Sequence, residues 1–212
     1  MKLYNANLSP NALRVRAVAH ELDIDLEIVD VDVFKGENKT EAFLALNPNG
    51  KVPVLVDGDL VIWESRAING YLSAMRPERG LHPEEPRKRA IVDQWSYWQA
   101  IHLGPALQRV TFERLLKPKF GMGDPDETAI EGQLKDIAQL LPVLNANLAD
   151  KEWIAGDLSV ADFAVASTFT YRDPAKISLA DVPHVSGWIS RLEARPSWKK
   201  AVAPLLDAAA RM

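Results

Sequence analysis

Cysteine is absent from all 212 residues of the sequence. Its absence excludes disulfides, thiolate metal sites and a cysteine nucleophile supplied by the chain. Histidine is scarce, and the four that occur lack the spacing of metal ligands, so we expect no metal: His20, His82, His102 and His184. No apolar run approaches the ~18 residues of a membrane span, and residues 1–10 lack the apolar core of a signal peptide. We therefore expect a cytoplasmic protein.

An excess of charge of one sign is also missing. The chain carries 25 Lys and Arg against 29 Asp and Glu, a formal net charge of -4, which gives no general attraction for nucleic acid. Hydrophobic residues make up 47% of the chain and charged residues 25%, as in ordinary globular proteins. A chain of this length can bury the core of one large domain or of two small ones.

Strand and helix patterns alternate in the first part of the chain. Residues 2–4 and 26–29 are typical of short strands, and residues 11–22 between them place apolar side chains at helical spacing. A strand, a helix and a second strand in this order predict parallel pairing through a right-handed crossover. A short helix is expected at 41–46.

Residues 47–71 contain a turn, two short strands and the start of a helix. The turn at 47–50 leads into a strand at 54–56, the Asp-Gly pair at 57–58 favours a hairpin turn, and a return strand follows at 60–62. Because both strands are short and apolar, we expect both to lie in a buried sheet.

Pro53 stands at the first position of the first of these two strands. A proline there cannot donate to the ladder, and it is a candidate for a cis peptide bond. The N–H and C=O of Val52 would then be available to pair with a peptide-like ligand as an added strand.

Glu64 and Ser65 lie where the hairpin ends and a helix begins. A carboxylate and a hydroxyl at this position can cap the free N–H groups of the first turn. The same N–H groups attract an external carboxylate. Taken alone, the pair is consistent with a helix cap or with an anion-binding site.

Prolines and a glycine cluster near the middle of the chain: Pro77, Gly80, Pro83 and Pro86. This composition predicts a linker at 77–86 between a first domain, 1–76, and a second domain, 87–212. The second domain shows apolar residues at helical spacing and no convincing strand, so it should be all-α, with a loop at 118–125 between its first long helices.

A capping box is expected inside the helical domain. Ser159 and Asp162 have its spacing, with Asp in place of the usual Glu, and Leu158 and Phe163 occupy the two positions of a hydrophobic staple. A cap contributes roughly 1 kcal/mol to stability and needs no ligand to explain it. We interpret this motif as a folding element.

The order of turn, Val-Pro, strand, Asp-Gly, strand, Glu-Ser and helix resembles the glutathione-binding half of cytosolic glutathione transferases. The segment SPNALRV, with Ser9 five residues before Arg14 and Val15, is similar to the serine-type members of that family, phi-, zeta- or theta-like, and we expect a bacterial type. The resemblance implies an α/β thioredoxin-like N-terminal domain and an all-α C-terminal bundle. It also implies glutathione as co-substrate, detoxification and a homodimer.

The resemblance implies that Ser9 is the catalytic residue. In such enzymes the serine hydroxyl donates a hydrogen bond to the glutathione sulfur and so favours the thiolate, which is the nucleophile. From its position alone, Ser9 before a proline at a helix start is also a typical helix cap. The amide of Asn11 is a second candidate donor. No histidine lies in a motif that suggests a Ser-His-Asp triad.

The remaining glutathione contacts follow from the resemblance. Val52, beside Pro53, would pair its backbone with the cysteinyl part, Glu64 and Ser65 would hold the γ-glutamyl end, and Lys39 would face the glycyl carboxylate.

The chain departs from the family in three places. Asn38 replaces the histidine that phi-like enzymes carry before the lysine, and Lys51 replaces a glutamine. Lys51 would hold a carboxylate or be a solvated lysine beside a turn. The zeta motif reads S-S-C, whereas this chain has Ser9-Pro10-Asn11, which weakens an isomerase interpretation.

The electrophile site is harder to locate. Trp95, Trp98 and His102 share a face of the first long helix, a stripe that is typical of a core. Because the family builds its hydrophobic pocket from this helix and from the loop after the first strand, the candidates are Trp98, His102 and Asn7.

The sequence therefore predicts a glutathione transferase that stabilises the thiolate for attack on an apolar electrophile. Dehalogenation, ether cleavage or peroxidase activity would use the same thiolate. The alternative of another class is a non-catalytic glutathione-binding or regulatory module with the same fold. A disulfide reductase is disfavoured because the chain has no cysteine.

Overall fold

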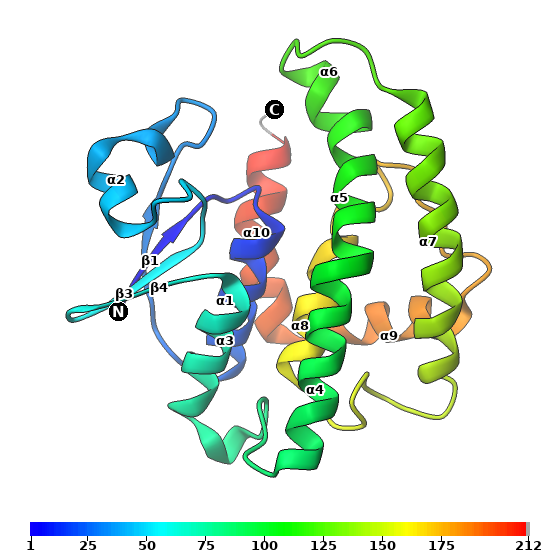
Figure 1. Cartoon of the computed structure of the whole chain (residues 1–212). Coiled ribbons are helices and arrows are strands. Elements are labelled where there is room, and N and C mark those ends of the chain that lie inside the picture. The colour runs from blue at the N-terminus through cyan, green and yellow to red at the C-terminus, as the bar shows by residue number, and fades with distance from the viewer. Residues whose placement is uncertain (211–212) are drawn as a thin grey trace. The chain divides into compact units, whose positions relative to one another are not determined.

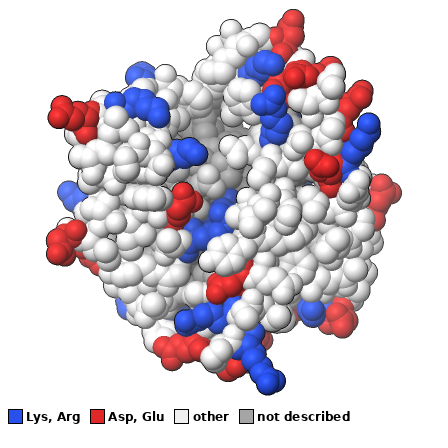
Figure 2. Space-filling model, viewed as in Figure 1, with Lys and Arg blue, Asp and Glu red and all other residues white. Residues whose placement is uncertain are grey.

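The computed structural model describes residues 1–210 and divides into two compact units (Figure 1). The first unit contains residues 1–83 together with the chain from Glu193 onward, and the second contains residues 84–192. None of the helices described is long and apolar enough to cross a bilayer. Figure 2 shows acidic and basic side chains interspersed over the visible face, without a continuous surface of either sign.

A four-stranded sheet lies at the centre of the first unit. Its strands are β1 (Lys2–Asn5), β2 (Glu27–Asp30), β3 (Val54–Asp57) and β4 (Leu60–Trp63), in the order β2-β1-β3-β4. β1 and β2 pair in parallel, as the crossover rule predicts, and the other pairs are antiparallel.

Two details of the hairpin differ from expectation. Asp57 pairs with Leu60, so the two-residue turn is formed by Gly58 and Asp59, one residue later than predicted. The prediction that both strands are buried is wrong for β4, where Leu60, Val61 and Trp63 are each about two-fifths exposed. The reason is that β4 is an edge strand, whereas β3 lies between two neighbours.

Three helices surround this sheet: α1 (Pro10–Glu21), α2 (Glu41–Leu46) and α3 (Ser65–Ala74). Phe43 of α2 packs with Val54 and Tyr4 on one face. Leu3 and Leu55 are fully buried and point to the other face, where α1 and α3 lie side by side (Figure 1). Two short 3-10 turns, η1 (Glu37–Lys39) and η2 (Pro77–Arg79), complete the segment.

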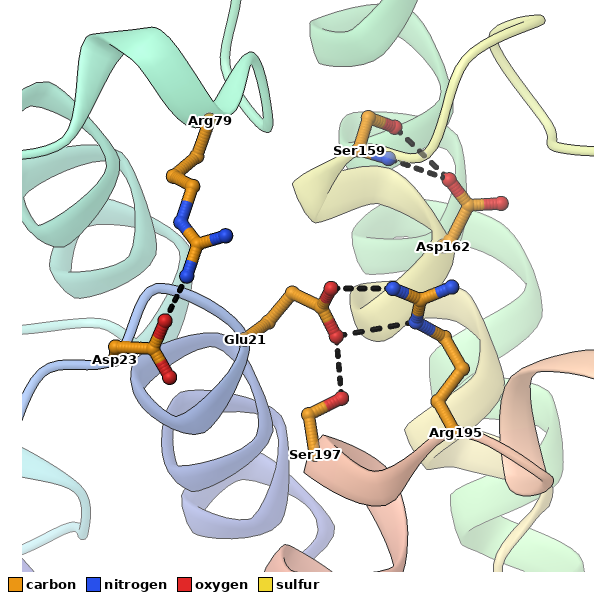
Figure 3. A network of polar contacts seen from close by, with 7 residues as sticks. All are labelled: Glu21, Asp23, Arg79, Ser159, Asp162, Arg195 and Ser197. Atoms are coloured by element: carbon orange, nitrogen blue, oxygen red, sulfur yellow. Dashed lines mark hydrogen bonds and ion pairs between the residues drawn. The ribbon is translucent and has the colours of Figure 1, made fainter.

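The last helix, α10 (Pro196–Ala210), belongs to the first unit and packs against α1. Figure 3 shows Arg195 and Ser197, at its start, hydrogen-bonded to the carboxylate of Glu21 at the end of α1. Burial alone would raise the pKa of Glu21, but the hydrogen bonds from Arg195 and Ser197 outweigh it and hold the pKa below its usual value.

The expected assignment of all residues from 87 to 212 to one helical domain therefore differs from the structure at its C-terminal end. Helical periodicity predicts that the C-terminal segment is a helix, but it does not show which of the two units the apolar face of α10 packs against.

The second unit is helical, and no strand lies among residues 84–192. It begins with one long, nearly continuous helical run: α4 (Pro86–Trp98), η3 (Gln99–Leu103), α5 (Gly104–Thr111), η4 (Phe112–Leu116) and α6 (Lys117–Lys119). The segments η3 and η4 are single π-helical turns. The run is followed by α7 (Glu127–Asn147), α8 (Val160–Ala166), η5 (Ser167–Phe169) and α9 (Pro183–Glu193).

The loop between α6 and α7 is fixed by a buried carboxylate from η4. Glu113 accepts hydrogen bonds from Lys117 Nζ and from the backbone N–H of Asp126, both at 2.9 Å, and pairs with Arg109. The bond from Lys117, followed by that from Asp126, lowers the pKa of Glu113. A loop is present in the expected segment 118–125, but its first two residues, Pro118 and Lys119, still lie in α6.

The predicted capping box of α8 is present (Figure 3). The fully buried carboxylate of Asp162 accepts hydrogen bonds from the backbone and hydroxyl of Ser159, from the backbone of Ile154 and from the indole of Trp188. Burial raises the pKa of Asp162, and these four donors oppose that effect. The carboxylate therefore holds three separate segments of the second unit together.

Replacing Asp162 with alanine should lower the free energy of unfolding by about 3 kcal/mol, because it removes the cap and leaves buried donors without acceptors. Urea unfolding measures this loss. Ser159→Ala is the matched control, since it removes only the hydroxyl of the cap and should cost about 1 kcal/mol. Equal losses in the two variants would contradict the wider role of Asp162.

Candidate active site

Ser9 ends the loop between β1 and α1 and is the N-cap of α1. Its backbone is extended, with φ -84° and ψ 118°, and its hydroxyl oxygen accepts the N–H of Ala12 at 3.3 Å. Capping uses a lone pair of the oxygen and leaves the O–H able to donate. The cap and the donor function are therefore compatible, and the cap holds the oxygen at the positive end of the helix.

Asn11 lies in the first turn of the same helix. Its side chain is exposed, whereas the next eight residues of α1 are buried. Ser9 is only partly exposed. Both candidate donors to sulfur thus sit at the start of α1.

The Val52-Pro53 peptide bond is cis, as predicted. Pairing between β3 and β1 starts at Val54, so Val52 precedes the ladder. The turn before it is fixed by the buried side chain of Asn47, which donates to the carbonyl of Lys51 at 2.7 Å and accepts the N–H of Asn49 at 3.0 Å.

Lys39 lies against this turn from a second segment. A Cβ built on Gly50, which has φ +63°, would come within 2.6 Å of Lys39 Nζ. Asn38, where phi-like enzymes tend to carry a histidine, donates to the carbonyl of Gly50 at 2.7 Å. Asn38 thus joins the segment that carries Lys39 directly to the turn at residues 47–50. The side chains of Lys39 and Lys51 are both exposed.

Glu64 has an unusual backbone at the N-cap of α3, with φ 71° and ψ 112°. Its side chain makes no capping hydrogen bond, so the interpretation of Glu64 as a helix cap is wrong. Ser65, the first residue of α3, is buried. A non-glycine residue in this region of φ/ψ space carries strain, and such strain concentrates at functional sites.

A buried arginine of α1 lies in the field of the Glu64 carboxylate. Burial lowers the pKa of Arg14, Arg66 lowers it further, and Glu64 opposes both by raising it. In the sequence Arg14 stands out only as part of the family pattern, which does not predict that its side chain is buried.

The weaker candidates for the electrophile site have different surroundings. Asn7, in the β1–α1 loop, donates to Asp30 at 3.3 Å and accepts from Asn5 at 2.9 Å. In the second unit Trp95 is buried and stacks edge-to-face with the half-buried Trp98, with ring centroids 5.1 Å apart. His102 is exposed.

The stripe of Trp95, Trp98 and His102 thus runs from core to surface. The π turn η3 begins directly after Trp98 and includes His102, and it shifts the register that regular helical spacing assumes.

Two family models match the chain. "Glutathione S-transferase, N-terminal domain" matches residues 1–74, and "Glutathione S-transferase, C-terminal domain" matches residues 105–196. The chain belongs to the glutathione S-transferase family. It is accordingly a glutathione transferase, with the expected thioredoxin-like N-terminal domain, the helical C-terminal domain and glutathione as its co-substrate.

Similar proteins cover nearly the whole chain. A glutathione S-transferase of Hyoscyamus muticus is 37% identical over 207 residues, which are 95% of this chain and 97% of that protein. The crystal structure of glutathione transferase F7 from Populus trichocarpa has a TM-score of 0.88 at 31% identity and covers 96% of this chain and 98% of its own. Maize glutathione S-transferase I, solved with an atrazine glutathione conjugate, has a TM-score of 0.86 at 34% identity and covers 96% and 97%. These three proteins come from plants and give no support to the expected bacterial type.

Replacing Glu64 with glycine should stabilise this transferase by about 1 kcal/mol and weaken glutathione binding roughly tenfold or more. The gain follows from relief of the strained backbone, and the loss from removal of the carboxylate that we expect to accept a charged hydrogen bond from the γ-glutamyl ammonium of glutathione. Urea unfolding and calorimetric titration with glutathione measure the two effects.

Lys176→Gly is the matched control, since Lys176 also has a positive φ of 55° but lies in the second unit. It should gain stability and keep its affinity. Unchanged affinity in Glu64→Gly would contradict a contact between Glu64 and glutathione.

Proposed function

We propose that Ser9 stabilises the thiolate of bound glutathione for attack on an apolar electrophile, as in serine-type, phi-like transferases. The observation that carries this proposal is the position of the hydroxyl. It is fixed by the N–H of Ala12 at the first turn of α1, and its proton is free to donate.

The energetic requirement is modest. A free thiol has a pKa of about 8.5, and lowering it by two units needs roughly 2.7 kcal/mol of preferential stabilisation of the anion. One charge-assisted hydrogen bond together with the positive end of a helix is of this size. The amide of Asn11, in the same turn, is the alternative donor.

The remaining proposed contacts orient glutathione through its polar ends. Val52, outside the β3 ladder, would pair its backbone with the cysteinyl residue beside Pro53. Glu64 and Ser65 would hold the γ-glutamyl amine and carboxylate, and the ammonium groups of Lys39 and Lys51 would face the glycyl carboxylate. Charges of opposite sign on the two sides favour one orientation of the tripeptide.

For the electrophile we propose an apolar site, with Trp98, His102 and Asn7 as the candidate residues. The maize relative with a bound atrazine conjugate supports conjugation of an aromatic electrophile as the reaction to test first. Dehalogenation, ether cleavage and peroxidase chemistry remain the alternatives, because they start from the same thiolate. A cytoplasmic location without a bound metal stays our expectation.

We also propose a twofold homodimer. In the first unit β4 exposes Leu60, Val61 and Trp63, and in the second unit the first long helical run exposes Ile91, Tyr97 and Ile101. Exposed large apolar side chains in each unit favour an interface with a second copy.

Light scattering after gel filtration should give twice the monomer mass for the wild type and a lower mass for Trp63→Glu, because the substitution places a charge on the apolar surface of β4. Val143→Glu is the control, since Val143 is 51% exposed on α7 outside this set. A monomeric wild type would contradict the dimer.

Substituting Ser9 with alanine should raise the thiol pKa of bound glutathione from well below the free value back toward it. The pKa is read from the ultraviolet absorbance of the thiolate in a pH titration, which needs no electrophile. If the thiol pKa stays depressed in Ser9→Ala but returns to the free value in Asn11→Ala, Asn11 is the donor to the sulfur. Saturable binding without any depression in the wild type would favour the non-catalytic module.

A further inference from the structure

A buried arginine joins the C-terminal helix to the strand that precedes Ser9. Arg16 of α1 is only 4% exposed. Its Nη1 donates to the side-chain oxygen of Asn5, and its Nε and Nη2 donate to the backbone carbonyl of Ala201 in α10, at 3.2 and 3.1 Å. The planar guanidinium thus bridges β1 and α10 from its place on α1. A lysine ammonium does not present donors in this fixed fork.

The side-chain amide of Asn5 connects Arg16 to the β1–α1 loop through further hydrogen bonds. Its Nδ2 donates to Asp30 Oδ1 at 2.7 Å and to Asn7 Oδ1 at 2.9 Å, and Asn7 donates in turn to Asp30 Oδ2 at 3.3 Å. The partners fix the orientation of the fully buried Asn5, because a guanidinium can only donate and an ionised carboxylate can only accept. Two residues of the β1–α1 segment are thereby held against the end of β2.

Ser9 is one tight turn away from these residues. Its N–H donates to the carbonyl of Ala6 at 2.9 Å, and its hydroxyl oxygen accepts from Ala12 at 3.3 Å. With Asn5 and Asn7 fixed, the turn between them and Ser9 has little freedom. The oxygen of Ser9 is therefore located from both sides, by the braced loop and by the helix that it caps.

We propose that Arg16 is a positioning residue for the thiolate site, which transmits the docking of α10 to the β1–α1 loop and so sets the direction of the Ser9 hydroxyl. This inference rests on the proposed function of Ser9. Its physical basis is that a hydrogen bond prefers an angle above about 150° and weakens steeply below about 120°. A small displacement of the loop would leave glutathione bound by its other contacts while its sulfur lost most of the donor.

A second arginine of the same helix pair provides the matched control. Arg195 also bridges α10 and α1, through Glu21 at 2.5 Å (Figure 3). Glu21 is the last residue of α1, whereas Ser9 caps its first turn. Removing Arg195 should weaken the packing of α10 as removing Arg16 does, without touching Asn5.

The experiment is a pH titration of the thiolate absorbance of glutathione bound to the wild type, Arg16→Met, Arg16→Lys and Arg195→Met, with affinity and urea unfolding measured on each. In Arg16→Met the thiol pKa should rise by about one unit, which leaves about tenfold less thiolate at a pH below both pKa values. Arg16→Lys should give a smaller rise. Arg195→Met should lose stability and keep the wild-type thiol pKa.

Each result decides between positioning and general stability. A pKa unchanged in Arg16→Met, or raised equally in Arg16→Met and Arg195→Met, would overturn the inference. If Arg16→Met does not fold, Asn7→Ala removes one link of the same brace at a partly exposed position and should raise the thiol pKa in the same direction, and no rise there would overturn it.

The Ser9→Ala titration separates this inference from the proposal on which it rests. If the thiol pKa is depressed in the wild type and in Arg16→Met but not in Ser9→Ala, the function of Ser9 stands and only that of Arg16 is removed. No depression in the wild type would remove both.

Discussion

The buried guanidinium of Arg16 requires hydrogen-bond acceptors, and two separate segments of the first unit supply them. Arg16 takes a side-chain oxygen from β1 and a backbone carbonyl from α10, two segments nearly two hundred residues apart in sequence. A buried charge without such partners would cost several kcal/mol. The hydrogen bonds of Arg16 therefore constrain how the sheet, α1 and α10 pack together, and the loop with Ser9 is part of this arrangement.

Local signals predicted much of this fold and of the candidate site. The serine before a proline at a helix start, the proline at the entry of β3 and the Ser159–Asp162 capping box each act within a few residues, and the structure contains all three. Features of this kind are legible because the residues that make them are neighbours in the chain.

The features that sequence could not predict depend on distant partners. The exposure of β4 follows from its place at the edge of the sheet, which no periodicity within the strand reveals. The positive φ of Glu64 occurs where the hairpin meets α3, and no local sequence pattern predicts it. The π turns alter the helical register that places Trp98 and His102. Asn5 and Arg16 are buried polar residues of different elements, and only the fold brings them together.

The first unit is discontinuous, since its last helix is encoded after the whole of the second unit. During synthesis the sheet, α1 and α3 leave the ribosome first, but their buried arginine lacks the carbonyl of Ala201 until α10 follows. The helical unit, whose residues are contiguous, can complete its core in the meantime. The first unit, although its sheet is translated first, is thus completed only after α10 has been made, and only then is the loop with Ser9 braced.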